Sequence, residues 1–168
     1  MKKCFLSALL ILFMLCSSSV PAIAAAPLTN TAEVDFLSLT EISETVEYFD
    51  DGSYLVTTIK TTPTPRAEVY TKSAAKEVTL YDSDDVIQWN YFLIGTYTIE
   101  TGVSSVCTNS TYQYNIYVNK WSLTDHSNWY SGNMAYGTAV FKKKVLFITT
   151  STQNIEGAVK CDEYGVVS

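Results

Sequence analysis

Histidine and arginine are nearly absent from this chain of 168 residues, which has one His and, in Arg66, one Arg. A cysteine nucleophile needs a histidine partner, and zinc sites take clustered His and Cys, so neither kind of centre is indicated. Asp125, His126 and nearby serines could be arranged as a hydrolase triad, but all lie within one short segment without a G-x-S-x-G motif. The sequence therefore predicts no catalytic residue, no metal and no cofactor.

Basic residues are also scarce, with 11 Lys and Arg against 17 Asp and Glu and a net charge of −6. This balance argues against nucleic acid and anionic membranes as partners, because both require basic surfaces. The one basic run, Lys142 to Lys144, is interpreted as a strand-edge device against aggregation. The residues around it, 135–150, are predicted to form one bent strand or a hairpin that turns at the lysines.

Long hydrophobic runs are missing except at the N-terminus, where Lys2 and Lys3 precede an apolar run over residues 5–16. That run is too short to cross a membrane, and Ala22-Ile23-Ala24 has the small-x-small pattern of a cleavage site. We predict a signal peptide over residues 1–24, with cleavage after Ala24 or Ala25. The alternative, a lipoprotein acylated on Cys16, lacks the small residue expected before the cysteine. Without a transmembrane anchor, the product is expected to be secreted into the extracellular space.

Only four cysteines occur, and cleavage would remove Cys4 and Cys16. Two thiols in an exported chain are most simply a disulfide, so Cys107 and Cys161 are predicted to pair. The alternative is that both are buried reduced thiols.

The chain lacks a convincing helical pattern and is rich in strand formers, with 13% aromatics and twelve Tyr. Its clearest stretch is 86–108, which is predicted to be a long strand, a turn and a second strand. Phe92 and Ile94 interrupt the polar face of the first strand, so its middle is expected to be covered on both sides. The apolar positions on its other face have a period of two, and they are Ile87, Trp89, Tyr91, Leu93, Tyr97 and Ile99. Strands and turns alternate to the end, which predicts an all-β antiparallel sandwich, or a barrel-like domain, over residues 66–168.

Residues 25–65 differ in character, because the acidic residues are dense and the first basic residue after the predicted signal is Lys60. Asp50-Asp51-Gly52-Ser53 between two strand-like segments predicts a hairpin over 45–60. The TTPTP sequence at 61–65 is interpreted as an extended linker, because prolines do not fit a central strand. Residues 25–65 are therefore expected to form an acidic N-terminal extension that ends in this hairpin and linker.

Several of these segments together resemble an uncharacterised family of small secreted proteins from Gram-positive, largely gut-dwelling, clostridia-like bacteria. They are YFDDGSYLVTTI, the TTP-type linker, a Y-x-S-x-D turn running into VIQW, G-T-Y, a single central Cys, a late F-K-K strand and the terminal CDEYGVVS. The resemblance implies export and an all-β domain, and it implies no activity.

Aromatic side chains provide the most specific functional signal. Residues 120–133 read as a loop that contains two tryptophans, and Trp and Tyr among small polar residues can form a platform for a sugar or a protein. The predicted binding residues are Trp121, Trp129, Tyr130 and Tyr136. The alternative is that the tryptophans close the end of the core. We expect a non-enzymatic extracellular binding module for a glycan or protein partner; a small hydrolase with an unrecognised site and an antimicrobial or toxin-like protein are the alternatives.

Overall fold

The computed structural model describes residues 39–168. The predicted signal peptide (1–24) and the first part of the predicted acidic extension (25–38) lie outside this range. The described residues are all-β. The eight strands are β1 (Thr40–Tyr48), β2 (Tyr54–Thr61), β3 (Val69–Tyr81), β4 (Ile87–Glu100), β5 (Ser104–Ile116), β6 (Trp121–Ser131), β7 (Met134–Val145) and β8 (Ile148–Lys160). From residue 39 onward, no helix with the length and apolar character of a membrane span is found.

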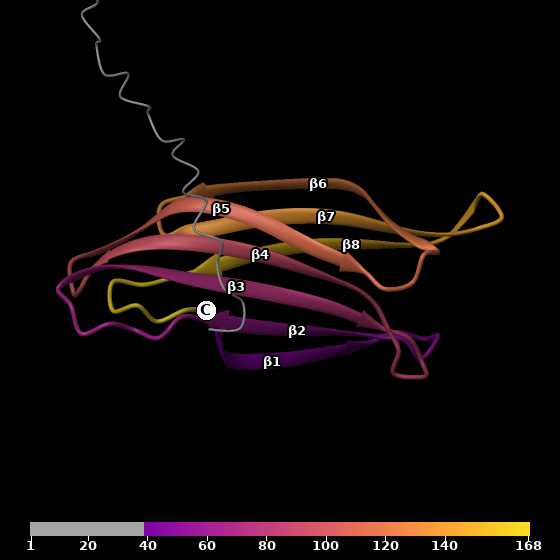
Figure 1. Ribbon diagram of the computed structural model, residues 1–168, viewed down its shortest axis with the longest axis horizontal. Helices are drawn as coiled ribbons and strands as arrows, with labels where there is room; N and C mark the ends of the chain where they lie inside the picture. Colours follow the sequence, from indigo (N-terminus) through magenta and orange to yellow (C-terminus); the bar gives the residue numbers. More distant parts are fainter. Residues whose placement is uncertain (1–38) are drawn as a thin grey trace, which may run out of the picture. The chain divides into compact units, whose positions relative to one another are not determined.

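The strands form two antiparallel sheets that face each other (Figure 1). One sheet has five strands in the order β1-β2-β3-β4-β5, and the other has three in the order β6-β7-β8. Neighbours in each sheet are consecutive in the chain, so every connection within a sheet is a hairpin. The predicted antiparallel β-sandwich is confirmed.

The core lies between β4 and β7. The ring of Trp89 stacks on Phe141 with centroids 4.0 Å apart and planes 2° apart, and Tyr91 meets the same Phe141 edge-on at 6.5 Å. Five of the residues that the period of two predicted on one face of β4 are at most 1% exposed. They are Trp89, Tyr91, Leu93, Tyr97 and Ile99. Ile94 on the opposite face is 2% exposed, so β4 is covered on both sides in its middle, as predicted.

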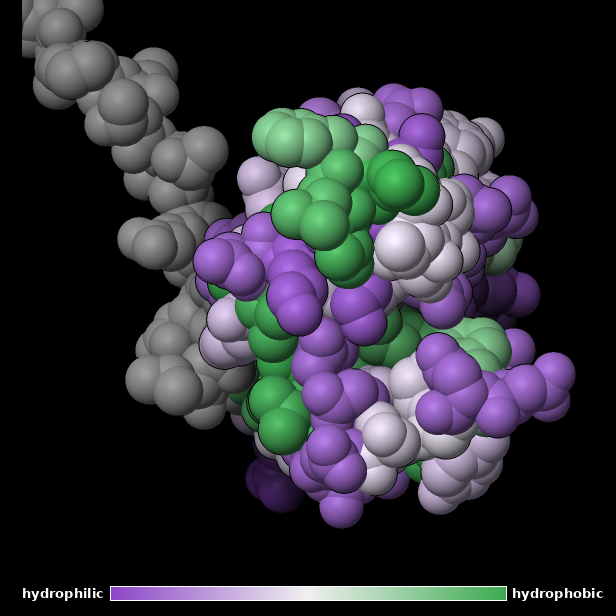
Figure 2. All heavy atoms as spheres, turned by 90° about the vertical axis from the view of Figure 1, so that its right-hand side faces the viewer, coloured by the Kyte–Doolittle hydropathy of each residue, from purple (hydrophilic) through white to green (hydrophobic). Residues whose placement is uncertain are grey.

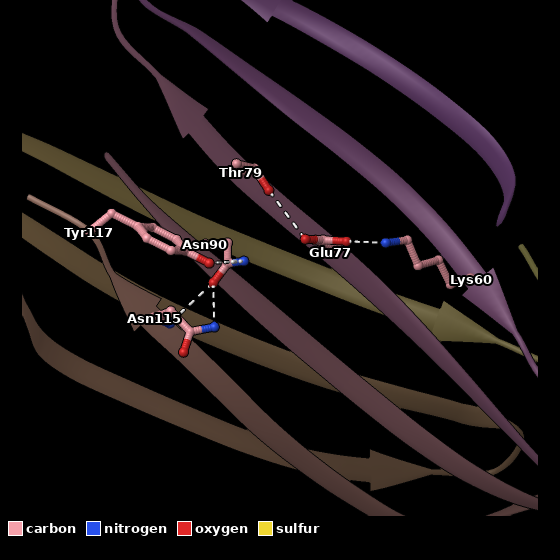
Figure 3. Close-up of polar contacts among 6 residues, drawn as sticks. All are labelled: Lys60, Glu77, Thr79, Asn90, Asn115 and Tyr117. Carbon is pink, nitrogen blue, oxygen red and sulfur yellow. Dashed lines mark hydrogen bonds and ion pairs between the residues drawn. The ribbon is translucent and has the colours of Figure 1, made fainter. Parts of the chain in front are cut away.

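Polar side chains on the outer face of the five-stranded sheet pair across the strands (Figure 3). The ammonium group of Lys60 on β2 donates to Glu77 on β3 at 2.5 Å. On the neighbouring strands, the side-chain oxygen of Asn90 accepts hydrogen bonds from the backbone N–H and the side-chain amide of Asn115, at 3.1 and 2.9 Å. Such cross-strand pairs add to the backbone ladder and help to fix its register.

The hairpin over 45–60 forms, but the predicted boundary at Pro65 is wrong. Strand β2 pairs with β3 along its whole length, from Tyr54 opposite Tyr81 to Thr61 opposite Ala74. The prolines of the TTPTP segment lie after β2 has ended, so they interrupt no ladder. The hairpin is therefore part of the main sheet, in agreement with the marginal stability of an isolated two-stranded hairpin in water.

Residues 120–133 are not a loop, because 121–131 form strand β6, which pairs with β7 from Trp121 opposite Lys143 to Ser131 opposite Met134. The polar composition of this segment suits the edge of a sheet, and pairing with the apolar strand β7 outweighs its weak intrinsic preference. The hairpin within 135–150 exists, but it turns at Leu146-Phe147 and not at the lysines.

The predicted disulfide is not formed, and Cys107 and Cys161 are free, buried thiols. Their backbone N–H groups donate to the carbonyl oxygens of Gly132 and Asn133, so the two cysteines flank the β6–β7 turn. Each thiol faces a backbone oxygen, that of Asn109 at 3.3 Å and that of Asp162 at 3.8 Å. Burial raises the pKa of both thiols, which keeps them protonated and makes them small apolar members of the core.

Candidate functional site

The four aromatic residues predicted to bind a partner do not form one cluster. Trp121 is only 6% exposed, lies edge-on to Trp89 at 6.1 Å, and donates its indole N–H to the side-chain oxygen of Gln88 at 3.3 Å. It belongs to the core, as the alternative interpretation held. Trp129 and Tyr130 are 47% and 51% exposed, but they follow each other in strand β6 and therefore point to opposite faces of its sheet.

The structure does bring Trp129 and Tyr136 together. They are cross-strand partners on β6 and β7, and their rings lie nearly parallel, with centroids 5.4 Å apart and planes 9° apart. The alternate residues of β7, Ala135 and Gly137, face the core, so this pair stands on the outer face of the three-stranded sheet. The hydroxyl of Tyr136 donates to the sulfur of Met134 at 3.1 Å, which holds the phenol ring in place. We call Trp129 and Tyr136 the aromatic pair.

A hollow of about 350 Å³ borders the aromatic pair. Two glycines that face each other across β7 and β8, Gly137 and Gly157, form part of its wall. Because neither has a side chain, the sheet is thin at this point. The remaining residues around the hollow are Lys76, Thr138, Glu156 and Ala158.

Lys76 reaches the hollow from the opposite sheet. It lies on β3 two residues before the buried Val78 and points inward, and its Cδ atom is 3.3 Å from where a Cβ atom at Gly157 would be. The side chain is half-buried, and desolvation lowers the pKa of its ammonium group. Within residues 39–168, no hydrogen bond or ion pair is made by this group, even though Glu156 lines the same hollow.

The second inward lysine of β3, by contrast, makes two hydrogen bonds within the protein. Lys72 is 4% exposed, and its ammonium group donates to the hydroxyl of Thr64 at 2.8 Å and to the carbonyl oxygen of Gly165 at 2.5 Å. Lys72 thus anchors the C-terminal turn to the sheet, whereas the ammonium group of Lys76 makes no such contact within the described residues.

Asp125 and His126, considered as parts of a triad, are adjacent in β6 and so face opposite sides of the sheet. The imidazole ring of His126 packs against Tyr112 at 4.2 Å. This arrangement does not aim the two side chains at each other, as a triad requires.

The binding residues predicted from the sequence did not include Lys76, Thr138, Glu156 or the glycine pair. Lys76 could have been found, because it shares the period-two face of Val78 and Leu80, and a lysine on a core-facing position is unusual. The glycine pair could not, since the register between β7 and β8 places Gly137 opposite Gly157.

Comparison of the chain with protein-family models, with curated proteins and with solved structures finds no match.

Proposed function

We propose that the chain is a secreted, non-enzymatic module that binds a carbohydrate against the aromatic pair, Trp129 and Tyr136. The observation that carries the proposal is the parallel stack of these two rings beside a hollow. Sugar rings have apolar faces and hydroxyl edges, so they fit a flat aromatic side chain surrounded by polar groups. The signal peptide, extracellular location and secreted Gram-positive family predicted from the sequence belong to the same proposal.

The polar groups of the hollow suit sugar hydroxyls. The Lys76 ammonium donates hydrogen bonds, the Glu156 carboxylate accepts them, and the Thr138 hydroxyl does both. The size of the hollow, about 350 Å³, is at the lower end of small-molecule sites, which run from about 300 to 1,000 Å³. A protein partner would instead need about 800 Å² of contact surface on each side.

The number of carboxylates around the hollow favours binding over hydrolysis. Among the described residues that line it, Glu156 is the one carboxylate. Glycoside hydrolysis ordinarily takes two carboxylates on either side of the scissile bond. The hollow therefore has the composition of a site that holds a sugar and leaves its bonds intact.

The test is a glycan array probed with the labelled protein starting at residue 26. Trp129→Ala should reduce binding at least tenfold, because it removes half of the aromatic pair. Tyr130→Ala is the matched control, since Tyr130 has nearly the same exposure, 51% against 47%, but lies on the opposite face of β6. The proposal would be contradicted if Trp129→Ala bound the array as well as wild type. It would also be contradicted if Trp129→Ala and Tyr130→Ala lost binding equally.

A further inference from the structure

Two apolar residues on the outer face of the five-stranded sheet are buried as deeply as the core. Ala75 on β3 and Ile94 on β4 are 0% and 2% exposed, and they are cross-strand partners. The adjacent residues on the two strands, Ala74 and Leu93, belong to the core between the sheets. Because successive side chains of a strand point to opposite faces, Ala75 and Ile94 point away from the three-stranded sheet. That sheet therefore cannot cover them.

The side chains around Ile94 do not account for its burial. Its cross-strand neighbours are Ala75 on β3 and Thr111 on β5. The first has only a methyl group, and Thr111 is itself exposed. Phe92 and Thr96, two residues away on β4, are half-buried. The eight described strands form two layers, so none of them lies over this outer face.

Burial is not general among the apolar residues of this surface. On the same outer face, Val69 of β3 and Val106 of β5 are 59% and 51% exposed. At the tip of the β7–β8 hairpin, Leu146 and Phe147 are 85% and 99% exposed. The view onto one end of the sandwich shows an apolar cluster with hydrophilic neighbours (Figure 2). The burial of Ile94 therefore marks a contact that is particular to its position.

The described chain begins at the level of this position. Thr40, the first residue of β1, is opposite Thr61 on β2, which is opposite Ala74 on β3, and Ala74 is opposite Gly95 on β4. The start of β1 thus lies in the same cross-strand row as the residue next to Ile94. At about 4.8 Å between neighbouring strands, β4 is roughly 14 Å from Thr40 across the sheet.

The residues that precede Thr40 have the length and composition to cross that distance. In an extended chain of about 3.4 Å per residue, the four residues from Phe36 to Thr40 span roughly 14 Å, which reaches β4. Residues 34–39 read VDFLSL, so four of the six are apolar and Asp35 is the one charged residue. Leu39, the last of them and the first described residue, is half-buried.

We infer that residues 34–37 lie across the outer face of the five-stranded sheet and cover Ala75 and Ile94. The segment is tethered to the edge strand of that sheet, so its local concentration at the patch is high and even a small apolar contact is sufficient to hold it. The end of the acidic extension would then be a third layer over β3 and β4. The inference does not depend on the carbohydrate site, which lies on the other sheet.

The test is nuclear magnetic resonance of the protein starting at residue 26. Nuclear Overhauser effects are expected from the ring protons of Phe36 to the methyl groups of Ile94 and Ala75. The methyl groups of Val106, on the same face but several residues farther along the strands, should show none.

A double variant adds a measure of stability. Phe36→Ser/Leu37→Ser should shift the methyl signals of Ile94 and raise the unfolding equilibrium constant in urea at least tenfold, because two apolar side chains lose their buried contact. Leu28→Ser is the matched control, since it removes a leucine from the same extension outside the segment, and it should behave like wild type in both measurements.

Absence of the nuclear Overhauser effects in wild type, or identical Ile94 signals in wild type and the double variant, would overturn the inference. The same effects found only between differently labelled chains in a mixed sample, together with a dimer in sedimentation, would also overturn it and assign the cover to a second copy of the chain. If the double variant does not fold, the effects measured in wild type decide the inference alone. None of these results depends on carbohydrate binding.

Discussion

The hydroxyl group of Tyr91 lies beneath Gly137 of the opposite sheet, 2.7 Å from the position that a Cβ atom would occupy there. Tyr91 is 1% exposed, and its hydroxyl has no hydrogen-bond partner within the described part of the chain. The missing side chain at position 137 thus makes room for a buried tyrosine of β4. The same missing side chain thins the wall of the hollow beside the aromatic pair, so core packing and the candidate site share one residue.

Removal of the Tyr91 hydroxyl should not destabilise the protein. A buried, unpaired hydroxyl costs free energy, so Tyr91→Phe should leave the free energy of unfolding unchanged or raise it by up to about 1 kcal/mol. Tyr97→Phe is the matched control, because the Tyr97 hydroxyl donates to the carbonyl oxygen of Val159 at 2.6 Å. That change should cost about 1–3 kcal/mol, since the buried carbonyl loses its donor. Equal losses in urea denaturation would show that the Tyr91 hydroxyl does have a partner.

The two glycines of the hollow should respond differently to substitution by alanine. At Gly137 the new Cβ would meet the Tyr91 hydroxyl at 2.7 Å and a Leu93 methyl group at 2.8 Å, so Gly137→Ala should cost about 1–3 kcal/mol through overpacking. At Gly157 the nearest atom is the flexible Cδ of Lys76 at 3.3 Å, so the cost should be below about 1 kcal/mol. Tyr91→Phe should recover part of the loss at Gly137. Chemical denaturation of wild type, the three single variants and the Gly137→Ala/Tyr91→Phe double variant measures both effects. Additive free-energy changes at positions 137 and 91 would count against this packing.

Lys76 should reduce stability at neutral pH and confer ligand binding in return. Burial lowers the pKa of its ammonium group, so the unfolded chain binds the proton more tightly than the folded chain. The penalty is present in full below the folded pKa and disappears as the pH rises to the ordinary value of 10.5. Lys76→Met should therefore be more stable than wild type at pH 7, and this difference should shrink toward pH 10.5. A less stable variant at pH 7 would mean that Lys76 has a partner in the folded protein.

The cysteines should titrate as two free thiols. In the protein starting at residue 26, Ellman's reagent should detect almost no thiol in the native state, because Cys107 and Cys161 are 1% and 0% exposed. Two thiols should appear after denaturation without reductant. The double variant Cys107→Ala/Cys161→Ala should then lose stability through lost packing and keep the same melting temperature with and without reductant. Absence of thiol in the denatured protein would restore the disulfide predicted from the sequence.

The long strand β4 and the β1–β2 hairpin could be predicted because their signals are local. A period of two places Trp89 and Tyr91 on one face wherever the strand is located, and Gly52 supplies the positive φ of its turn, 81°. Strand β6 could not be recognised, because its polar residues favour a loop and only its pairing with β7 makes it a strand. This error also placed Trp129 and Tyr130 together, although residues adjacent in a strand point to opposite faces.

The hairpin tip was missed for a related reason. Turns are found in a sequence by Gly, Asn, Asp and Pro, and Leu146-Phe147 contains none of them. The sequence pattern therefore predicts a turn at the lysines. Which strands lie at an edge is likewise set by sheet order, so the sequence could not show that β7 is paired on both sides.

The most direct test of the carbohydrate site is a nuclear magnetic resonance titration with the soluble oligosaccharide that the array retains best. The chain has three tryptophans, and Trp89 and Trp121 are 0% and 6% exposed while Trp129 is 47% exposed. We predict that the indole N–H signal of Trp129 shifts, together with backbone amides around Tyr136 and Gly157, and that the other two indole signals stay in place. Shifts confined to Trp121, to Tyr130 or to the β7–β8 tip would contradict the assignment of the site to the aromatic pair.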